Sequence, residues 1–167
     1  VPPEKRSTVY YGYRPKGLRR ERAARDPAAP MEVGLLGRIC PSKGHDLVIE
    51  AARRLRDESP AVCHFRFIGE APTPEETNAV RETIRRDGLS DLVELRGYRV
   101  DIASELAAMD LLLIPSVAEP FGRTLCEAAE ARVPVLLSDS GGLGEISHAF
   151  EIGVRFEPGN VDDLIAR

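Results

Sequence analysis

The chain has 167 residues, a mass of 18.3 kDa and a formal net charge of −4, with 43% hydrophobic and 30% charged residues. These values are typical of one folded domain and exclude a disordered chain, a coiled coil and a collagen-like repeat. No apolar run approaches the roughly 18 residues that a membrane span requires.

Positive charge is concentrated in the first part of the chain. Residues 1–30 hold eight Lys or Arg against three acids, a net charge of +5, so residues 31–167 carry −9. Because so acidic a body offers no long basic face, we expect no nucleic-acid partner. The basic stretch 14–25 is interpreted as a solvated loop, with contact to a neighbouring domain or an anionic membrane surface as the alternative.

The cysteines and histidines do not indicate a catalytic or metal centre. Cys40, Cys63 and Cys126 are far apart and lack metal-binding spacing, so we expect no zinc site, no disulfide and a reducing, cytoplasmic location. The three histidines share no spacing with a nucleophile. No metal and no cofactor are therefore predicted.

Apolar runs and helical periodicity alternate along the chain. The run 111–114 is apolar on both faces, as in a central parallel strand. The alternation predicts an α/β fold with a single Rossmann-like, doubly wound parallel sheet over 31–167, preceded in 1–30 by a short strand and the basic loop. Strands are expected at 7–11, 32–36, 62–68, 92–95, 111–114, 133–137 and 153–156, and helices at 45–58, 74–87, 101–109, 122–131 and 161–167.

Three local signals refine these boundaries. Gly88 is well placed to end the helix 74–87, and Asp101 to cap the start of the next helix. The Gly-rich run 141–145 is interpreted as a flexible turn between a strand and the next helix. In a parallel sheet, ligands bind at the carboxyl ends of the strands, so the loops that follow the strands are where function is expected.

The loop 37–44, after the first strand of the sheet, has the features of an anion site. Gly37 lets a ligand approach the backbone, Arg38 and Lys43 supply positive charge, and a helix N-terminus follows. The order of residues is neither that of a P-loop nor that of the dinucleotide motif. The alternative is a loop with two solvated cations.

The loop after 111–114 is the most informative part of the sequence. Gly122 marks a helix start, so the amides of residues 122–125 are expected to be unpaired and suited to an oxyanion. Glu127 follows inside that helix. An ionised carboxylate accepts two hydrogen bonds, which matches a ribose diol. Glu119 lies eight residues earlier, where it would face another part of the ligand.

The ends of two further predicted strands are candidates for a nucleobase pocket. Gly69 offers backbone groups, and Tyr98 offers an aromatic ring. The alternative for Tyr98 is a surface or packing aromatic without a binding role.

These motifs together resemble the nucleotide-sugar-binding half of retaining GT-B glycosyltransferases, the group 1 enzymes of family four with a Glu-x7-Glu motif. The resemblance covers about residues 31–160, and its most specific part is Glu-Pro-Phe-Gly-x4-Glu. The matching segments are Gly37-Arg38-x4-Lys43-Gly44, Pro115-Ser116-x2-Glu119-Pro120-Phe121-Gly122-x4-Glu127-Ala128, Pro134-Val135 and Gly141-Gly142-x2-Glu145.

The resemblance implies a role for each matched position. Glu119 is the catalytic residue and faces the donor sugar, Glu127 binds the ribose hydroxyls, and Gly69 and Tyr98 lie at the base. The other donor-binding positions are Gly37 with the diphosphate-binding pair Arg38 and Lys43, and the turn formed by Phe121 and Gly122 with the amides of Arg123, Thr124 and Leu125.

The resemblance also implies an activity: transfer of a hexosyl group, without a metal, from a UDP-, GDP- or ADP-sugar to a saccharide or lipid-linked acceptor. The family's N-terminal domain, which binds the acceptor, is absent from this chain, so we expect the chain alone to be inactive. Two departures are Arg132 in place of a glycine and Gly144 in place of a proline. The alternatives are a nucleotide-sugar epimerase of GT-B architecture and a non-catalytic binding module.

Overall fold

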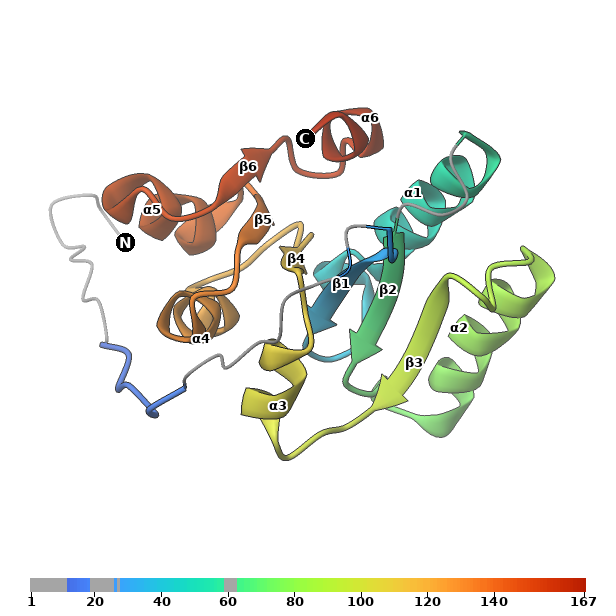
Figure 1. Cartoon of the computed structure of the whole chain (residues 1–167), viewed down its shortest axis with the longest axis horizontal. Coiled ribbons are helices and arrows are strands. Elements are labelled where there is room, and N and C mark those ends of the chain that lie inside the picture. The colour runs from blue at the N-terminus through green and yellow to red at the C-terminus, as the bar shows by residue number, and fades with distance from the viewer. Residues whose placement is uncertain (1–11, 19–25, 27, 59–62) are drawn as a thin grey trace, which may run out of the picture.

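A computed structural model describes residues 12–18, 26, 28–58 and 63–167. In this part of the chain, six strands form one sheet in the order β3-β2-β1-β4-β5-β6, and every neighbouring pair is parallel (Figure 1). The predicted α/β class and Rossmann-like sheet are confirmed, while the expected strand 7–11 lies outside the described residues. The strands are β1 (Met31–Leu36), β2 (Cys63–Ile68), β3 (Val93–Gly97), β4 (Leu111–Ile114), β5 (Val135–Ser138) and β6 (Val154–Phe156).

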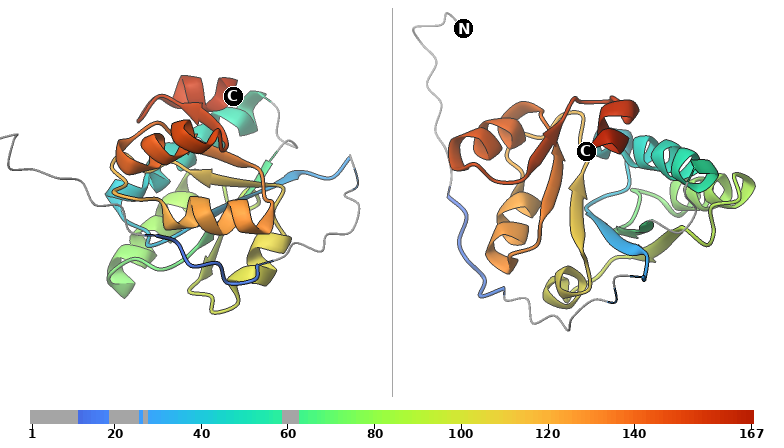
Figure 2. Two further views of the ribbon diagram at one scale, coloured as in Figure 1. Left: turned by 90° about the vertical axis from the view of Figure 1, so that its left-hand side faces the viewer. Right: turned by 45° about the horizontal axis from the view of Figure 1, so that its top comes forward.

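Helices cover both faces of the sheet (Figure 2). Buried side chains of α1, α2 and α6 pack in one hydrophobic cluster, and those of α3, α4 and α5 pack in a second. The helices are the 3-10 helix η2 (Pro41–Lys43), α1 (His45–Glu58), α2 (Pro74–Arg86), α3 (Ile102–Ala107), α4 (Arg123–Ala131), α5 (Gly141–Phe150) and α6 (Val161–Ala166).

Strand β4 shows how the sheet separates these two clusters. Leu113 belongs to the cluster of α1 and α2, whereas Leu112 and Ile114 belong to the cluster of α3, α4 and α5. Alternating side chains of one strand therefore fill both layers, which explains why this run is apolar at every position.

The strand order brings the two candidate loops together. Strand β1 pairs with β2 on one side and with β4 on the other, so the direction of the winding reverses between β1 and β4. The loops that follow these two strands consequently lie next to each other at the carboxyl edge, the usual place for a ligand in such sheets.

Two of the three local predictions are confirmed and one is wrong. Gly88, with φ of +66°, follows the end of α2, and the Asp101 side chain accepts a 3.0 Å bond from the Ser104 amide at the start of α3. The run 141–145 is the beginning of α5 rather than a turn. Its glycines have low helix propensity, and the buried Leu143 in the second cluster supplies the packing that stabilises the helix.

No helix in the described part of the chain combines the length and apolar character that a bilayer crossing needs.

Candidate functional site

The loops after β1 and β4 are joined by their backbones. The Val117 amide donates a 3.1 Å hydrogen bond to the Ser42 carbonyl. Gly44 has φ of +71°, and a Cβ at this position would lie 2.2 Å from the Pro115 carbonyl oxygen. Only glycine therefore permits this close approach without strain, and the approach brings Lys43 to the β4 loop.

Lys43 and Glu119, 76 residues apart in the sequence, form an ion pair at this junction. The second carboxylate oxygen of Glu119 accepts a 3.2 Å hydrogen bond from the Gly122 amide. Burial raises the pKa of the Glu119 carboxyl, but Lys43 and the amides of Gly122 and Phe121 outweigh burial and hold it below its ordinary value. Glu119 is consequently an ionised, oriented carboxylate at neutral pH.

The N-terminus of α4 offers fewer free amides than the sequence predicts. Gly122 occupies the N-cap with φ of +88°, and its amide is bonded to Glu119. The Leu125 amide donates a 3.0 Å bond back to the Gly122 carbonyl. The expectation of four unpaired amides over 122–125 is therefore wrong, because the helix begins with a tight turn. The amides of Arg123 and Thr124 remain to meet a ligand.

Glu127 lies one turn further along α4 and is paired with a lysine that sequence reasoning missed. Its side chain is only 6% exposed, and its Oε1 lies 2.5 Å from the Lys16 ammonium and 3.7 Å from Nε of Arg123. Lys16 falls in the stretch 14–25, which the sequence predicts to be a solvated loop. Residues 14–17 are exposed and have no regular structure, as predicted, but Lys16 contacts α4 and Leu18 is buried; residues 19–25 lie outside the described part of the chain.

Glu130 is the second residue that sequence reasoning missed. It accepts a 2.6 Å bond from the Tyr13 hydroxyl and further bonds from the amides of Lys16, Gly17 and Leu18. The Tyr13 hydroxyl and these three amides lower the pKa of Glu130 to about 2. The spacing of Glu127 and Glu130, three residues apart on a helix, was the available signal, because it places both acids on one face.

The predicted base-pocket residues lie at the ends of β2 and β3. The Gly69 amide donates a 2.9 Å bond to the Gly97 carbonyl, and the Tyr98 amide lies 3.4 Å from Oε1 of Glu70. Gly69, Glu70 and Gly97 also line a hollow of about 480 Å³ that extends towards α2. Because Tyr98 is 70% exposed, it is not a packing aromatic in the described structure.

The remaining predicted residues lie at the same edge of the sheet. Gly37 directly follows β1, and its amide donates a 3.0 Å bond to the Ile68 carbonyl at the end of β2. Arg38 is exposed on the loop that follows β1, and Phe121 is half-buried between Glu119 and Gly122. The structure thus joins Lys43, Glu119 and Gly122 by direct contacts and places the other predicted residues on neighbouring loops or, for Arg123, Thr124, Leu125 and Glu127, in α4. Their binding roles stay predictions.

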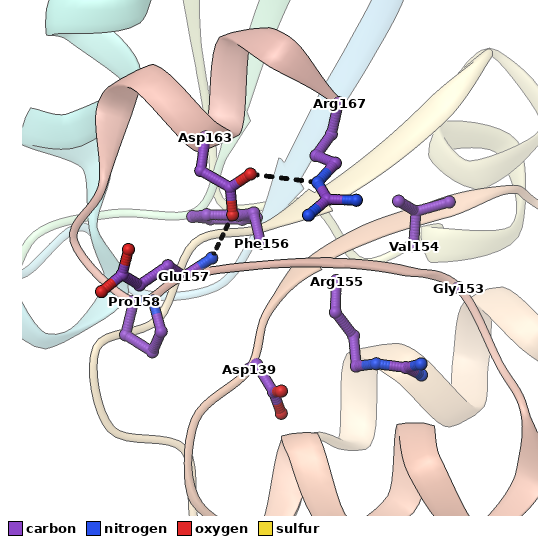
Figure 3. Close-up of a pocket in the computed structure, with 9 residues that line it drawn as sticks. All are labelled: Asp139, Gly153, Val154, Arg155, Phe156, Glu157, Pro158, Asp163 and Arg167. Carbon is purple, nitrogen blue, oxygen red and sulfur yellow. Dashed lines mark hydrogen bonds and ion pairs between the residues drawn. The ribbon is translucent and has the colours of Figure 1, made fainter.

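A larger hollow, of about 650 Å³, lies between the end of β6 and α6 (Figure 3). Asp163 there accepts a 2.7 Å bond from the Glu157 amide and a 3.0 Å bond from Nε of Arg167 (Figure 3). None of the predicted site residues lines this hollow. Within the described residues, no group of three or more His, Cys, Asp or Glu is arranged to hold a metal ion.

Solved structures share this arrangement of strands and helices. Anabaena HepE, crystallised in complex with UDP and glucose, superposes with a TM-score of 0.72 at 30% identity, over 83% of this chain and 38% of HepE. The C-terminal domain of a group 1 family protein (LpcC) from Francisella tularensis superposes with a TM-score of 0.67 at 24% identity, over 90% of this chain and 83% of LpcC, and shows the fold alone. The chain is thus a Rossmann-like domain of the GT-B type.

Sequence comparison identifies the family. Residues 30–167 match the family described as "Glycosyl transferases group 1", and the chain belongs to it. It is 35% identical over 114 residues, 65% of this chain, to a mannosylfructose-phosphate synthase of Agrobacterium fabrum. It is 30% identical over 131 residues, 77% of this chain, to a 2-deoxystreptamine N-acetyl-D-glucosaminyltransferase of Niallia circulans. The matches span 25% and 33% of these relatives.

Proposed function

We propose that this chain is the donor-binding domain of a retaining glycosyltransferase of family four, of the Glu-x7-Glu type. Residues 31–167 bind a nucleoside-diphosphate sugar, and a separate N-terminal domain binds the saccharide or lipid-linked acceptor. The observation that carries this proposal is the contact of Lys43 with Glu119 beside the N-terminus of α4. This contact gathers a cation, an oriented acid and backbone amides where a parallel sheet binds its ligands.

The charges at this edge match the chemistry of the transfer. When the glycosyl group leaves, negative charge develops on the nucleoside diphosphate. Arg38, the ammonium of Lys43 and the amides of Arg123 and Thr124 supply preorganised positive charge for it, so we propose a reaction that needs no metal. An ammonium donates three hydrogen bonds, so Lys43 can contact a phosphate oxygen while it holds Glu119.

The two acids have different roles in this proposal. Glu119 faces the hydroxyls of the donor sugar and is the catalytic residue. Glu127 is largely buried and bound to Lys16, so it is proposed to bind the ribose rather than to attack the sugar as in a double-displacement glycosidase. Tyr98 and Gly69 lie at the proposed base position.

Similarity to known proteins supports the substrate class. HepE has been crystallised with UDP-glucose as well as with UDP. A lipopolysaccharide core mannosyltransferase, LpsB of Rhizobium meliloti, is 32% identical over 72% of this chain and 34% of its own length. We therefore propose a UDP-, GDP- or ADP-linked hexose as the donor. None of the three cysteines, all within the described residues, forms a disulfide, which favours the cytoplasm as the location.

A ligand panel on the 167-residue chain tests the proposal. Calorimetry with UDP, GDP, ADP, uridine and inorganic pyrophosphate, each with and without EDTA, should show that at least one nucleoside diphosphate binds more tightly than uridine or pyrophosphate. The affinity should be unchanged by EDTA. Absence of binding for all three nucleoside diphosphates would contradict a donor-binding role, and loss of binding in EDTA would contradict metal independence. In a separate incubation with UDP-glucose, conversion of the glucosyl group to another sugar, detected by chromatography, would favour the epimerase.

A further inference from the structure

Residues 13–18, which we call the N-terminal strap, run along α4 and contact both of its acids (Figure 2). We propose that the strap covers the ribose subsite of the unliganded chain: the ammonium of Lys16 occupies Glu127, and a nucleotide must displace it to bind. This inference rests on the proposed function, because it takes Glu127 as the ribose-binding acid.

Glu130 determines where the strap lies. Its Oε1 accepts bonds of 2.8, 2.5 and 3.0 Å from the amides of Lys16, Gly17 and Leu18, and its Oε2 accepts the Tyr13 hydroxyl. One carboxylate thus binds four donor groups of a short segment 112 to 117 residues away in the sequence. Charge-assisted bonds of this kind are the stronger ones, so the backbone of the strap is held in register with α4.

Leu18 fixes the other end of the strap. Its side chain is buried in the hydrophobic cluster formed by α3, α4 and α5. A segment held by a buried leucine at one end and by a carboxylate along its length cannot easily shift as a whole. The Lys16 side chain is consequently presented to Glu127 by a fixed backbone.

The exposures of the paired residues show how the subsite can open. The Glu127 side chain is 6% exposed, whereas that of Lys16 is 49% exposed. Two ribose hydroxyls therefore have little access to Glu127 while Lys16 is in place. The half-exposed Lys16 side chain can rotate into solvent, and Arg123, 3.7 Å from the carboxylate, stays as a counter-ion of the buried Glu127. The opening movement is thus a rotation of one side chain, and the backbone of the strap stays in place.

This arrangement predicts that the loss of one cation strengthens nucleotide binding, the opposite of the usual effect. Removal of a cation near a diphosphate site ordinarily weakens the binding of an anion. Lys16 instead competes with the ribose, so its removal should strengthen the binding of nucleotides. Inorganic pyrophosphate has no ribose, so its affinity should stay the same or fall.

Calorimetry on the 167-residue chain with UDP and with inorganic pyrophosphate tests the inference. Lys16→Ala should bind UDP about two- to fivefold more tightly than the unmodified chain, which corresponds to the loss of one part-exposed ion pair. Glu130→Ala should give a similar gain by releasing the strap, and the double variant should gain no more than either single variant, because both changes act through one contact. Lys16→Arg, which keeps the cation, should leave the UDP affinity unchanged.

Arg14→Ala is the matched control, because Arg14 is an exposed cation on the same segment. Its removal should leave the UDP affinity unchanged or slightly reduced. Equal or weaker binding of UDP by Lys16→Ala, with binding by the unmodified chain intact, would overturn the inference and leave the donor-binding role standing. An equal gain for pyrophosphate would overturn it too. Failure of every variant to bind UDP would overturn the donor-binding role and this inference with it.

Discussion

The two acids of the candidate site are each paired with a lysine, but the lysines come from different parts of the molecule. Lys43, which pairs with Glu119, lies on a short loop between two elements of the core, β1 and α1. Lys16, which pairs with Glu127, lies on an N-terminal segment that crosses the outside of α4. The first pair is built into the fold, whereas the second depends on the docking of a separate segment.

This difference separates what each pair can do. The Lys43 loop is tied to the β4 loop by the Val117 amide and by the close approach of Gly44, so Lys43 is positioned before any ligand arrives. Preorganisation of this kind suits a group that stabilises developing charge. Glu130 and Leu18 hold the backbone of the strap in place, but the Lys16 side chain is half-exposed, which suits a contact that exchanges with a ligand. Five experiments test whether the two pairs differ in this way.

The largest effect is expected on stability, from a substitution of Gly44, which lies next to Lys43 of the first pair. In Gly44→Ala, the new Cβ would lie 2.2 Å from the Pro115 carbonyl oxygen, at a φ of +71°. The free energy of unfolding, measured by urea titration, should fall by about 3 kcal/mol. Gly159→Ala is the control, because Gly159 has a φ of +75° but nothing within 4 Å of a Cβ. It should lose only about 1 kcal/mol from backbone strain, and equal losses would contradict the role of close approach.

Acid should weaken the same region through His45, which begins α1 directly after Gly44. Burial lowers the pKa of His45 to about 4, and the Cys40 backbone only partly opposes this shift. Neither ring nitrogen of His45 has a hydrogen-bond partner among the described residues. The folded state therefore binds the proton less readily than the unfolded state, and stability falls as the pH drops from about 6.5 through 4.

The expected loss over that pH range is about 3 kcal/mol, read from urea titrations at each pH. His45→Leu should remove most of this pH dependence. His148→Leu, which changes an exposed histidine, is the control and should keep it. A pH dependence that His45→Leu leaves intact would assign the acid sensitivity to other groups.

Lys43→Ala should reduce the affinity for UDP by about tenfold or more, because a charge-assisted contact to the diphosphate is lost. Pyrophosphate should lose as much, and uridine should be unaffected. The loss of Lys43 should also raise the pKa of Glu119, since burial then acts with less opposition. Arg85→Ala, on the exposed last turn of α2, is the control for a lost charge. Unchanged UDP affinity in Lys43→Ala would remove Lys43 from the site.

Glu127→Ala should weaken only the binding of ligands that contain a ribose, because Glu127 belongs to the second pair. Uridine and UDP should each bind about fivefold more weakly. The ribose loses its hydrogen bonds to a charged group, but Lys16 then no longer competes with it, which offsets part of the loss. Pyrophosphate should be unaffected. Glu75→Ala, an exposed acid in the first turn of α2, controls for the lost charge. Equal losses for uridine and pyrophosphate would count against the ribose assignment.

The smallest effect is expected at the end of α4, the helix that carries Glu127 and Glu130. Arg132 ends this helix with φ of +56°, a left-handed conformation that favours glycine. Arg132→Gly should raise the free energy of unfolding by about 0.5 to 1 kcal/mol and leave UDP affinity unchanged. Urea titration measures the first quantity and calorimetry the second. A loss of stability would mean that the arginine makes contacts that outweigh the strain.

Much of the fold could be predicted because its signals are local. The apolar run 111–114, the cap at Asp101 and the stop at Gly88 depend on a few adjacent residues, and all three predictions are confirmed. Helix α5 was missed because glycines at its start hide its periodicity, and burial of Leu143 against the second cluster stabilises it. Local propensity is a weak guide wherever packing decides the outcome.

The candidate site divides in the same way. Glu119, Gly122 and Glu127 could be singled out because they lie close together in the sequence, on the loop after one apolar strand and in the helix that follows it. Lys43 could be singled out too, but not its contact with Glu119, which lies 76 residues away. Lys16, which lies 111 residues from Glu127, could not be singled out as a partner.

The alternation of strands and helices, the family and the acids of the proposed site can be predicted from the amino-acid sequence, because periodicity and spacing are properties of neighbouring residues. The pairing of each lysine with its acid, and the binding of the N-terminal strap to α4 through Glu130, are seen only in the folded chain. Such contacts join segments far apart in the chain, and they form only when the sheet order and the packing of the helices bring those segments together.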